Sequence, residues 1–599
     1  MKKWKIKNLK FTNKILKKID KLIKLKQFDK SLSEIKKISF FDLDESSINS
    51  LKKKISVNYN SYLKSNNYRK LKILFLSNHY LEYFKYNFFI SGIEKNLIFD
   101  LEFGKVNHLN FNELSKNIKD NIKNFDLIIY SNFINYEKKL DIDSSFLNLS
   151  KNIELIKKFN PNILIIKNPL VSEKFIHNNL LKKYNTHLEK FCSKNKFLFW
   201  DISLLQNKIG FDNLHDSRFF FDYKIFFNPK FSEDISNHLA SFLSFKFNTN
   251  IRLVITDLDN TMWSGLAAED TIEEIEYLPG SSLGEPHYHY QLFLNELFKK
   301  NILIAAASKN KIETIKGIFK EKNFPFKFKN FINTKINWKA KSQNILEICK
   351  DTNLSPEHVL FIDDSKSEIF EVLENVPKIN VLSFEKSSEI NSNINSSNLF
   401  MEFSNEKINR FKSIQTSKPI NFKLNDKKSY NRHLKALKMK IKINKINNNN
   451  INRFIELINK TSQFNFNLKR TNHFELKKFL KNKNNIGLTF QLSDRFIDHG
   501  IISNTMIKVN NSVATIEAFV MSCRVFERKV EFFIMDKIIE KLKKSKIKFI
   551  ECLFIKTNRN AQFENYYDLM GFKNIKNTNN KKFYRLNINE YKKIDFYIK

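Results

Sequence analysis

Cysteine is scarce in this chain, and its four residues lie far apart. Cys192, Cys349, Cys523 and Cys552 form neither a CxxC pair nor a spacing that would support a disulfide ladder. The pattern therefore argues against a secreted disulfide scaffold and favours a reducing, cytoplasmic setting.

Long apolar runs are missing as well. The first residues are basic, but Lys and Asn interrupt every apolar stretch before the roughly 7 to 15 residues that a signal peptide needs. Elsewhere no run approaches the roughly 18 apolar residues of a membrane helix. We therefore expect neither a signal peptide nor a membrane span.

Acidic residues are outnumbered, with 63 Asp and Glu against 103 Lys and Arg and a formal net charge of +40. Dense positive charge neutralises phosphates, so nucleic acid is the first partner to consider. The excess is mostly lysine, however, spread evenly along a chain that is rich in Asn, Ile and Phe and holds only 10 glycines. That pattern is typical of codon bias. Because no basic stripe interleaves with stacking aromatics, we expect no nucleic-acid partner.

The length of 599 residues exceeds what one hydrophobic core organises and predicts roughly three or four domains. Residues 1–66 carry apolar positions at helical spacing and predict a helical leader. In residues 67–248, short apolar strands alternate with helical stretches, which predicts a parallel sheet covered by helices. The expected strands lie at residues 72–78, 126–132, 162–168 and 197–203.

A second α/β pattern covers residues 249–385, with strands that lead into the segments 252–261, 302–310 and 358–365. Residues 386–436 predict a linker with helices, because 386–398 is polar and short of apolar anchors. Residues 437–599 predict an α+β module with strands at 486–493, 500–509, 512–522 and 548–556. The expected fold class is therefore a multidomain α/β protein.

Two carboxylates follow directly on the buried strand pattern RLVIT. Asp257 and Asp259 lie two residues apart at its carboxyl end and are expected to point the same way. One carboxylate can then attack phosphorus while the other protonates the leaving group. Two carboxylates and a phosphate repel one another without a cation, which predicts Mg²⁺ as cofactor. A lone DxD at a strand end more often forms only a turn or cap.

Three further segments carry residues that suit phosphoryl transfer. Ser308 ends the strand ILIAAAS and can donate to a phosphate oxygen, and Lys341 in NWKAKS can neutralise charge on an aspartyl phosphate. Asp363 and Asp364 end the strand HVLFI and supply the remaining metal carboxylates. Four elements in this order predict a phosphoryl-transfer centre.

The motifs DLDNTMWSG, AAASKN, INWKAKS and FIDDS resemble the FkbH-like branch of the haloacid-dehalogenase (HAD) superfamily. The resemblance implies a HAD-like Rossmannoid domain in which Asp257 is the nucleophile and Asp259 the acid/base. It implies a metal set of Asp257, Asp259, Asp363 and Asp364. The residues expected around the phosphate are Thr261, Ser308, Lys309, Asn310 and Lys341. Only about 40 residues separate the first two motifs, too few for a large cap domain, so we expect an open site.

Four later motifs, INKTSQFNFNLKR, DHGIISN, MSCRVFERKVE and KTNRNAQFENYYDLMGF, resemble the acyltransferase-like module of the same family, whose fold is similar to GNAT acyltransferases. In GNAT proteins an R-x-x-G-x-G turn cradles a pyrophosphate at a helix N-terminus. Here Glu527 and Lys529 replace the glycines, which puts coenzyme A binding in question.

A possible acyl-transfer site follows from these motifs: Cys523, Arg524, Asn560 and Tyr567. Cys523 adjoins Arg524 and is near Arg528, which would favour its thiolate. The alternative is a buried, small hydrophobic cysteine. Tyr567 is equally well explained as a packed aromatic beside Gly571 and Phe572.

In the first α/β domain, Ser77 at a strand end and the pair Asp212 and His215 are similar to the SGNH-hydrolase arrangement, in which a late histidine deprotonates a strand-end serine. The nucleophile segment reads L-S-N-H instead of G-D-S. We therefore expect a degenerate SGNH-like, flavodoxin-type domain in preference to a working esterase. His79 and His215 could equally be ordinary polar residues at strand ends.

The FkbH-like resemblance implies a function: a phosphorylated three-carbon acid such as 1,3-bisphosphoglycerate is dephosphorylated, and its glyceryl group is loaded as a thioester on an acyl carrier protein. Such a route supplies polyketide or surface-polysaccharide building blocks. One alternative is a plain small-molecule phosphatase. Another is a scaffold that binds a carrier protein or glycan without turnover.

Overall fold

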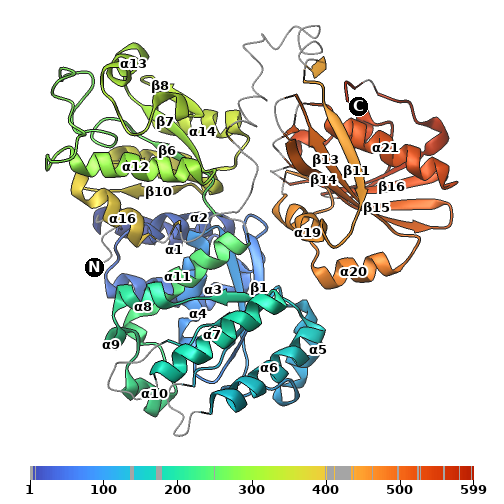
Figure 1. Cartoon of the computed structure of the whole chain (residues 1–599), viewed down its shortest axis with the longest axis horizontal. Coiled ribbons are helices and arrows are strands. Elements are labelled where there is room, and N and C mark those ends of the chain that lie inside the picture. Colours follow the sequence, from blue (N-terminus) through green and yellow to red (C-terminus); the bar gives the residue numbers. More distant parts are fainter. Residues whose placement is uncertain are drawn as a thin grey trace. The chain divides into compact units, whose positions relative to one another are not determined.

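The computed structural model describes residues 5–6, 9–134, 141–169, 178–247, 250–397, 399–400, 411, 434–435, 437–461, 463–495, 498–522, 525–526, 528–557, 560–578, 580–594 and 596–598. It divides into two compact units, Met1–Phe403 and Ser404–Lys599. Figure 1 shows both as layered α/β structures. None of the helices described here is long and apolar enough to span a membrane.

The first unit begins with the three helices α1 (Leu9–Lys24), α2 (Phe28–Ser39) and α3 (Glu45–Tyr62), as the spacing of apolar residues predicts. The carboxylate of Asp44 accepts a hydrogen bond from the Ser47 amide and caps α3. Helix α2 joins the two sheets of this unit, because Nζ of the buried Lys36 donates to Oδ1 of Asn96 (2.8 Å) and to the carbonyl oxygen of Lys378 (2.9 Å).

The first sheet has the strand order β2-β1-β3-β4-β5, and all neighbours are parallel. Its strands are β1 (Arg69–Ser77), β2 (Leu97–Phe103), β3 (Leu127–Ser131), β4 (Ile163–Ile166) and β5 (Leu198–Trp200). Helices α4 (Lys85–Glu94) and α11 (Ser232–Lys246) cover one face. Helices α5 (Lys116–Asn121), α6 (Ile142–Phe159) and α7 (Asn178–Asn195) cover the other. Three short helices precede α11, namely α8 (Ser203–Ile209), α9 (Phe211–Leu214) and α10 (Ser217–Tyr223). The flavodoxin-type parallel sheet is the one expected, whereas β2 was missed.

The second sheet is also parallel, with the order β10-β9-β6-β7-β8. Its strands are β6 (Leu253–Thr256), β7 (Leu303–Ser308), β8 (Asn333–Ile336), β9 (Val359–Asp363) and β10 (Asn380–Ser383). Helices α12 (Glu285–Lys299), α13 (Ile312–Glu321) and α16 (Ile390–Ser396) share one core with this sheet. Helices α14 (Lys341–Thr352) and α15 (Lys366–Asn375) pack against each other. The chain runs outward from β6 through β7 and β8 and then returns to β9 on the other side of β6. The switch point therefore lies at the carboxyl ends of β6 and β9, where sheets of this kind usually bind their ligands.

The segment 386–398, expected to be a linker, instead continues this domain. Ile390 and Ile394 are buried in the core of the second sheet, and Nδ2 of Asn393 donates to the carbonyl oxygen of Ser383 (3.0 Å). The linker prediction was wrong here because two isoleucines four residues apart suffice to anchor one short amphipathic helix. Residues 401–410 and 412–433, where further helices were expected, lie outside the described residues.

The second unit holds a mainly antiparallel sheet with the order β11-β13-β14-β15-β16-β18-β17. Its strands are β11 (Lys440–Lys445), β13 (Ile486–Ser493), β14 (Asp498–Asn510), β15 (Val513–Met521), β16 (Phe549–Ile555), β17 (Lys573–Thr578) and β18 (Lys581–Asn587). Helices α21 (Val530–Lys544) and α22 (Tyr566–Leu569) pack on one face. Helices α19 (Ile451–Lys460) and α20 (His473–Lys481) pack on the other.

Strands β15 and β16 are parallel and pair only over Val513–Ile516 and Phe549–Cys552. Beyond those residues a two-residue strand, β12 (Phe464–Asn465), pairs with Met521 and Val520 at the end of β15. The next residue, Phe466, accepts a hydrogen bond at its carbonyl oxygen from the Ile555 amide at the end of β16 (2.6 Å). One segment therefore bonds to both strands where they no longer pair with each other.

Candidate active site

The carboxyl ends of β6 and β9 bring three predicted residues together. Nζ of Lys341, at the first residue of α14, lies 3.0 Å from Oδ1 of Asp257 and 2.5 Å from Oδ2 of Asp363. The side chains of Asp257 and Asp363 are 9% and 0% exposed, and that of Lys341 is 4% exposed. Burial by itself lowers the pKa of Lys341, but the charges of Asp257 and Asp363 outweigh burial and raise it above its usual value. Lys341 is therefore a fixed positive charge beside the expected nucleophile.

Asp259 occupies different surroundings. Its Oδ1 accepts hydrogen bonds from Nε1 of Trp263 (3.2 Å) and from the Ala267 amide (3.1 Å), and its Oδ2 accepts one from Nδ2 of Asn310 (2.9 Å). Burial raises the pKa of Asp259 above its usual value, and the hydrogen bond from Asn310 opposes this shift without cancelling it. A carboxyl group that holds its proton more tightly suits a general acid.

Three carboxylates are placed to hold a cation. One ligand oxygen each from Asp257, Asp363 and Asp364 lies within 4.8 Å of the others. Burial, followed by the charge of Asp257, raises the pKa of Asp364 to about 6 and the pKa of Asp363 well above its usual value. A bound divalent cation would offset their mutual repulsion, and an all-oxygen set suits Mg²⁺. Asp259, which was expected among the metal ligands, is not in this group, because its carboxylate oxygens bond to Trp263, Ala267 and Asn310.

Polar atoms without hydrogen-bond partners gather around the same strand ends. They are Oδ1 of Asp257, Oγ1 of Thr261 and Oδ1 of Asn310, all buried. For Asp257, the 3.0 Å approach of Lys341 is an ion pair without hydrogen-bond geometry. Buried polar atoms of folded proteins are nearly always satisfied, and an exception calls for an explanation. A bound cation and phosphate would satisfy oxygens and hydroxyls in these positions, so the residues fit Mg²⁺ and a phosphorylated ligand.

The loop that carries Asp259 rests on helix α12, which sequence reasoning did not assign to the site. Nδ1 of His287 lies 2.9 Å from the carbonyl oxygen of Thr261, and Nε2 of Gln291 donates to that of Met262 (2.7 Å). The hydroxyl of Tyr290 donates to Oγ1 of Thr256 (2.9 Å), directly before Asp257. These three helix residues are four or fewer positions apart, so they share one face of α12. Polar residues at that spacing in the sequence HYHYQ are the signal that could have identified them.

The other expected phosphate contacts divide into two groups. Ser308 is buried at the end of β7, and its Oγ accepts a hydrogen bond from Nδ2 of Asn310 (3.1 Å), so both lie beside Asp259. Lys309 is instead engaged in an ion pair: its side chain is 40% exposed, and its Nζ bonds to Oε1 of Glu368 (2.6 Å). Residues 257–284, all of which are described, contain no helix, so no helical cap is inserted between β6 and α12.

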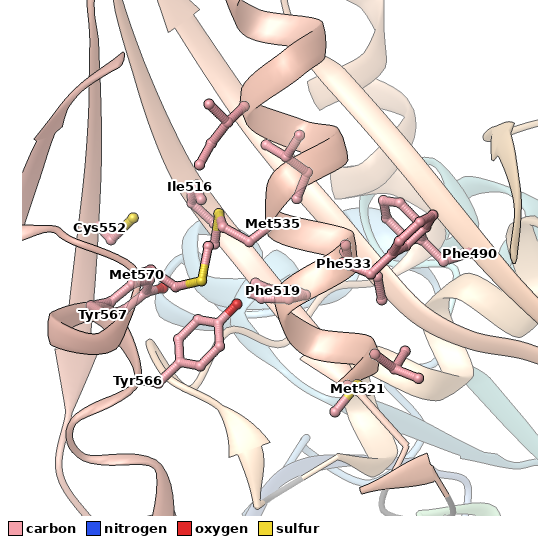
Figure 2. Packing of buried hydrophobic residues seen from close by; sticks show 14 of the residues in the cluster. Phe490, Ile516, Phe519, Met521, Phe533, Met535, Cys552, Tyr566, Tyr567 and Met570 are labelled. Carbon is pink, nitrogen blue, oxygen red and sulfur yellow. The ribbon is translucent and has the colours of Figure 1, made fainter. Parts of the chain in front are cut away.

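In the second unit, two expected acyl-transfer residues make structural contacts. Asn560 is fully buried, and it holds a turn by accepting from the Thr557 amide (2.8 Å) and donating to the carbonyl oxygen of Ile555 (2.8 Å). Tyr567 lies in the hydrophobic core with Cys552 and Met570 (Figure 2). Both residues are therefore explained by packing and backbone hydrogen bonds. Cys523, Arg524 and Glu527 lie outside the described residues.

The expected hydrolase residues of the first domain do not form a nucleophile and base pair. The hydroxyl of the buried Ser77 donates to the carbonyl oxygen of His79 (2.7 Å), and Nδ1 of His215 lies 2.6 Å from the carbonyl oxygen of Phe226. His79 stacks on Phe133 at 4.5 Å. The side chain of Asp212 lies outside the described residues. These contacts favour the degenerate-scaffold interpretation of this domain.

No protein-family model matches the chain, and no curated protein matches it in sequence. Several solved structures, however, resemble parts of the chain. The N-terminal part of protein BF1531 from Bacteroides fragilis, described as containing a phosphatase domain complexed with Mg, is 20% identical over 56% of this chain and 96% of its own, with a TM-score of 0.49. The ribosomal-protein-S18-alanine N-acetyltransferase of Escherichia coli is 12% identical over 25% of this chain and 94% of its own, with a TM-score of 0.20. A GNAT-family acetyltransferase of Staphylococcus aureus is 18% identical over 25% of this chain and 99% of its own, with a TM-score of 0.19. These likenesses are too remote to assign an activity to this chain.

Proposed function

We propose that the protein is a Mg²⁺-dependent HAD-type phosphoryl-transfer enzyme that forms a phosphoryl intermediate on Asp257. One observation carries the proposal. Asp257, Asp363 and Asp364 converge at the ends of β6 and β9. Lys341 lies between Asp257 and Asp363. A structural turn or cap does not need three converging carboxylates and a buried lysine, whereas phosphoryl transfer needs both.

Each residue has a separate task in this reaction. The Asp257 carboxylate attacks phosphorus, and the bond between phosphorus and the leaving oxygen breaks as Asp259 gives that oxygen its proton. Lys341 offsets the negative charge on the phosphoryl group, and Ser308 and Thr261 supply hydroxyl donors. Asp259 then takes a proton from the water that hydrolyses the aspartyl phosphate. Mg²⁺, held by Asp257, Asp363 and Asp364, would neutralise the charge that builds up in both steps.

The test is phosphate release by the Asp257→Asn variant. An amide is a far poorer nucleophile than a carboxylate and a weaker metal ligand, so we expect a loss of roughly a thousandfold or more, about 4 kcal/mol of transition-state stabilisation. EDTA should abolish the activity of the wild type, and added Mg²⁺ should restore it. The exposed Asp222 gives a matched control, Asp222→Asn, which should behave as wild type. Substantial Mg²⁺-dependent turnover by Asp257→Asn would contradict the proposal.

The finer proposal is that the enzyme acts on a phosphorylated three-carbon acid such as 1,3-bisphosphoglycerate and transfers its glyceryl group to the phosphopantetheine thiol of an acyl carrier protein. In that reaction the acyl-phosphate bond breaks, inorganic phosphate leaves and a thioester forms, while the phosphoryl centre hydrolyses the remaining phosphate ester. It is supported by the motif resemblance of both parts of the chain to FkbH-like proteins and by the absence of a helical cap within residues 257–284.

A plain small-molecule phosphatase is the second candidate, and the buried positions of Asn560 and Tyr567 favour it, because packing and turn hydrogen bonds explain both residues without a role in acyl transfer. The two candidates differ in their products. Wild-type protein is incubated with 1,3-bisphosphoglycerate, Mg²⁺ and candidate carrier proteins, and the carriers are weighed by intact-protein mass spectrometry. A glyceryl adduct supports transfer. Release of phosphate without an adduct on any carrier supports the plain phosphatase. If neither phosphate nor an adduct forms, the result supports a binding scaffold.

A further inference from the structure

A buried charged cluster lies in the second unit. Oδ2 of Asp494 accepts a hydrogen bond from Nη1 of Arg528 (2.8 Å) and lies 2.7 Å from Nε2 of His499. The side chains of Asp494 and His499 are 0% exposed, and that of Arg528 is 3% exposed. Asp494 follows β13, His499 lies in β14, and Arg528 precedes α21, so three elements contribute to one cluster.

Arg528 uses only part of its guanidinium group in this cluster. Nη1 contacts Asp494 and lies 3.2 Å from Nε2 of His499. Nε and Nη2 are buried and have no hydrogen-bond partner. These two nitrogens form the side edge of the guanidinium plane, and their N–H groups point in parallel. That edge matches the two oxygens of a carboxylate or a phosphate.

Burying Nε and Nη2 of Arg528 without hydrogen-bond acceptors costs folding free energy, unless a bound ligand supplies the acceptors. A buried donor without an acceptor loses its bonds to water and gains nothing in return, and the penalty is larger for a charged group. Burial lowers the pKa of Arg528, and the attraction of Asp494 does not fully restore it. The contact of Nη1 with Asp494 also restricts rotation of the guanidinium plane, which leaves the free edge in a fixed direction.

The neighbouring backbone adds a second favourable feature. Helix α21 runs for 15 residues from Val530, so its first amides lie directly after Arg528 and Lys529. The first amides of a helix carry partial positive charge and favour an anion nearby. Lys529 also adopts a left-handed backbone conformation with φ of 57°. Such conformations are strained for residues other than glycine and concentrate at functional sites.

We infer that the Nε and Nη2 edge of Arg528 is a binding site for a small organic acid, which it holds through two oxygens of a carboxylate or phosphate group. Asp494, supported by His499, fixes the guanidinium group from the other side. This site consists of residues of the second unit, whereas the proposed phosphoryl centre consists of residues of the first unit. Binding at Arg528 can therefore be tested independently of the proposed phosphatase activity.

Calorimetry on the full-length wild type tests the site. The phosphoryl centre is first saturated with beryllium fluoride and Mg²⁺, and the protein is then titrated with D-glycerate or with inorganic phosphate. We expect one further site per chain for at least one probe. Binding of glycerate alone identifies a carboxylate as the ligand group, and binding of phosphate alone identifies a phosphate. If neither probe binds the saturated wild type, the inference is wrong, and this result needs no variant to fold.

The matched variants are Arg528→Lys and Arg453→Lys. Lysine keeps the charge but loses the two parallel donors, so Arg528→Lys should weaken the additional site by roughly tenfold or more. Arg453 on α19 bonds to Glu456 at the surface, and its replacement should leave binding unchanged. Unchanged affinity in a folded Arg528→Lys would overturn the inference. Phosphate release by the same variants, measured in parallel, should equal that of wild type, which separates this result from any failure of the phosphoryl centre.

Discussion

Asp257 and Asp259 are two residues apart, and their neighbours assign them different roles. Nζ of the buried Lys341 lies 3.0 Å from Oδ1 of Asp257, the proposed nucleophile, and places a positive charge beside it. Asp259 receives hydrogen bonds from neutral groups, among them Asn310 and Trp263, and burial raises its pKa. The division of work that we propose between nucleophile and acid thus rests on residues outside the DxD motif.

Asn310 should therefore act as a positioning residue. Asn310→Ala removes the hydrogen bond to Oδ2 of Asp259, and we expect kcat for phosphate release to fall by roughly 10- to 100-fold, the usual cost of losing an orienting partner, with little change in KM. The adjacent Lys309 provides the control, because its Nζ bonds to Glu368 at the surface. Lys309→Ala should keep wild-type kcat. An equal loss in both variants would instead indicate that the segment as a whole binds phosphate.

His79 predicts a pH dependence of stability in the first unit. Burial, followed by the nearby His215, lowers the pKa of His79 from 6.5 to about 3. Between pH 6.5 and 3, this histidine is protonated in the unfolded chain but stays neutral in the folded protein. The free energy of unfolding therefore falls as the pH drops from 6.5 towards 3, by at most roughly 1.4 kcal/mol per pH unit for this group.

Urea unfolding followed by tryptophan fluorescence measures this effect, because all four tryptophans belong to the first unit. The loss of stability between about pH 7 and pH 5 should be smaller in His79→Gln than in wild type. His289→Gln, at a position that is 57% exposed, should lose as much as wild type. Part of the loss will persist in His79→Gln, because burial also lowers the pKa of His238 to about 4. An identical loss in wild type and His79→Gln would contradict the prediction.

At the scale of single residues, sequence identified the groups that follow directly on a strand pattern. Asp257, Ser308 and Asp363 could be placed because parallel strands end at one edge of a sheet. The contact between Asn310 and Asp259 depends on a rotamer, and the support from Tyr290 depends on which face of α12 is buried, neither of which a local pattern specifies. The turn that Asn560 holds could not be predicted, because a buried asparagine in a turn has the same local sequence signal as a polar site residue.

Among the elements, most strands that carry a continuous apolar run were predictable, although β2 was missed. The two-residue strand β12 has no periodicity to detect, yet it bonds to β15, and its neighbour Phe466 bonds to β16. Phe464 and Phe466 are 0% and 1% exposed and pack among aromatic rings of the core. The segment 464–466 therefore closes the sheet where its two parallel strands separate.

Phe466→Ala should consequently destabilise the second unit by about 3–5 kcal/mol, since a buried ring is removed and a cavity is left behind. Hydrogen–deuterium exchange of the β15 and β16 amides in urea measures the change, because this unit contains no tryptophan. Phe474→Ala, at a position that is 53% exposed on α20, is the matched control and should change little. If both variants exchanged equally slowly, the ring of Phe466 would contribute little to the stability of the second unit.

At the scale of the whole molecule, the repeated alternation of strand and helix predicted two parallel sheets and a third, mainly antiparallel one. It could not show that the first two sheets and the N-terminal helices form one compact unit. That association depends on long-range contacts such as those of Lys36 in α2 with Asn96 and Lys378. A lysine in an amphipathic pattern is normally read as a solvated residue, so the sequence gives no sign that this one is buried between domains.

Loading a carrier protein through an enzyme-bound thioester needs a reactive thiol on the enzyme. The three cysteines in the described part of the chain are buried, and burial raises the thiol pKa to about 12 for Cys192 and Cys349 and well above its usual value for Cys552. Such thiols are poor nucleophiles at neutral pH.

Cys523 is the remaining candidate, next to Arg524 in the sequence. Cys523→Ser should therefore release phosphate normally but fail to load the carrier protein, as measured by intact mass, whereas Cys349→Ser should do both. A folded Cys523→Ser that loads the carrier at the wild-type rate would exclude a thiol relay and leave direct transfer from the phosphorylated substrate.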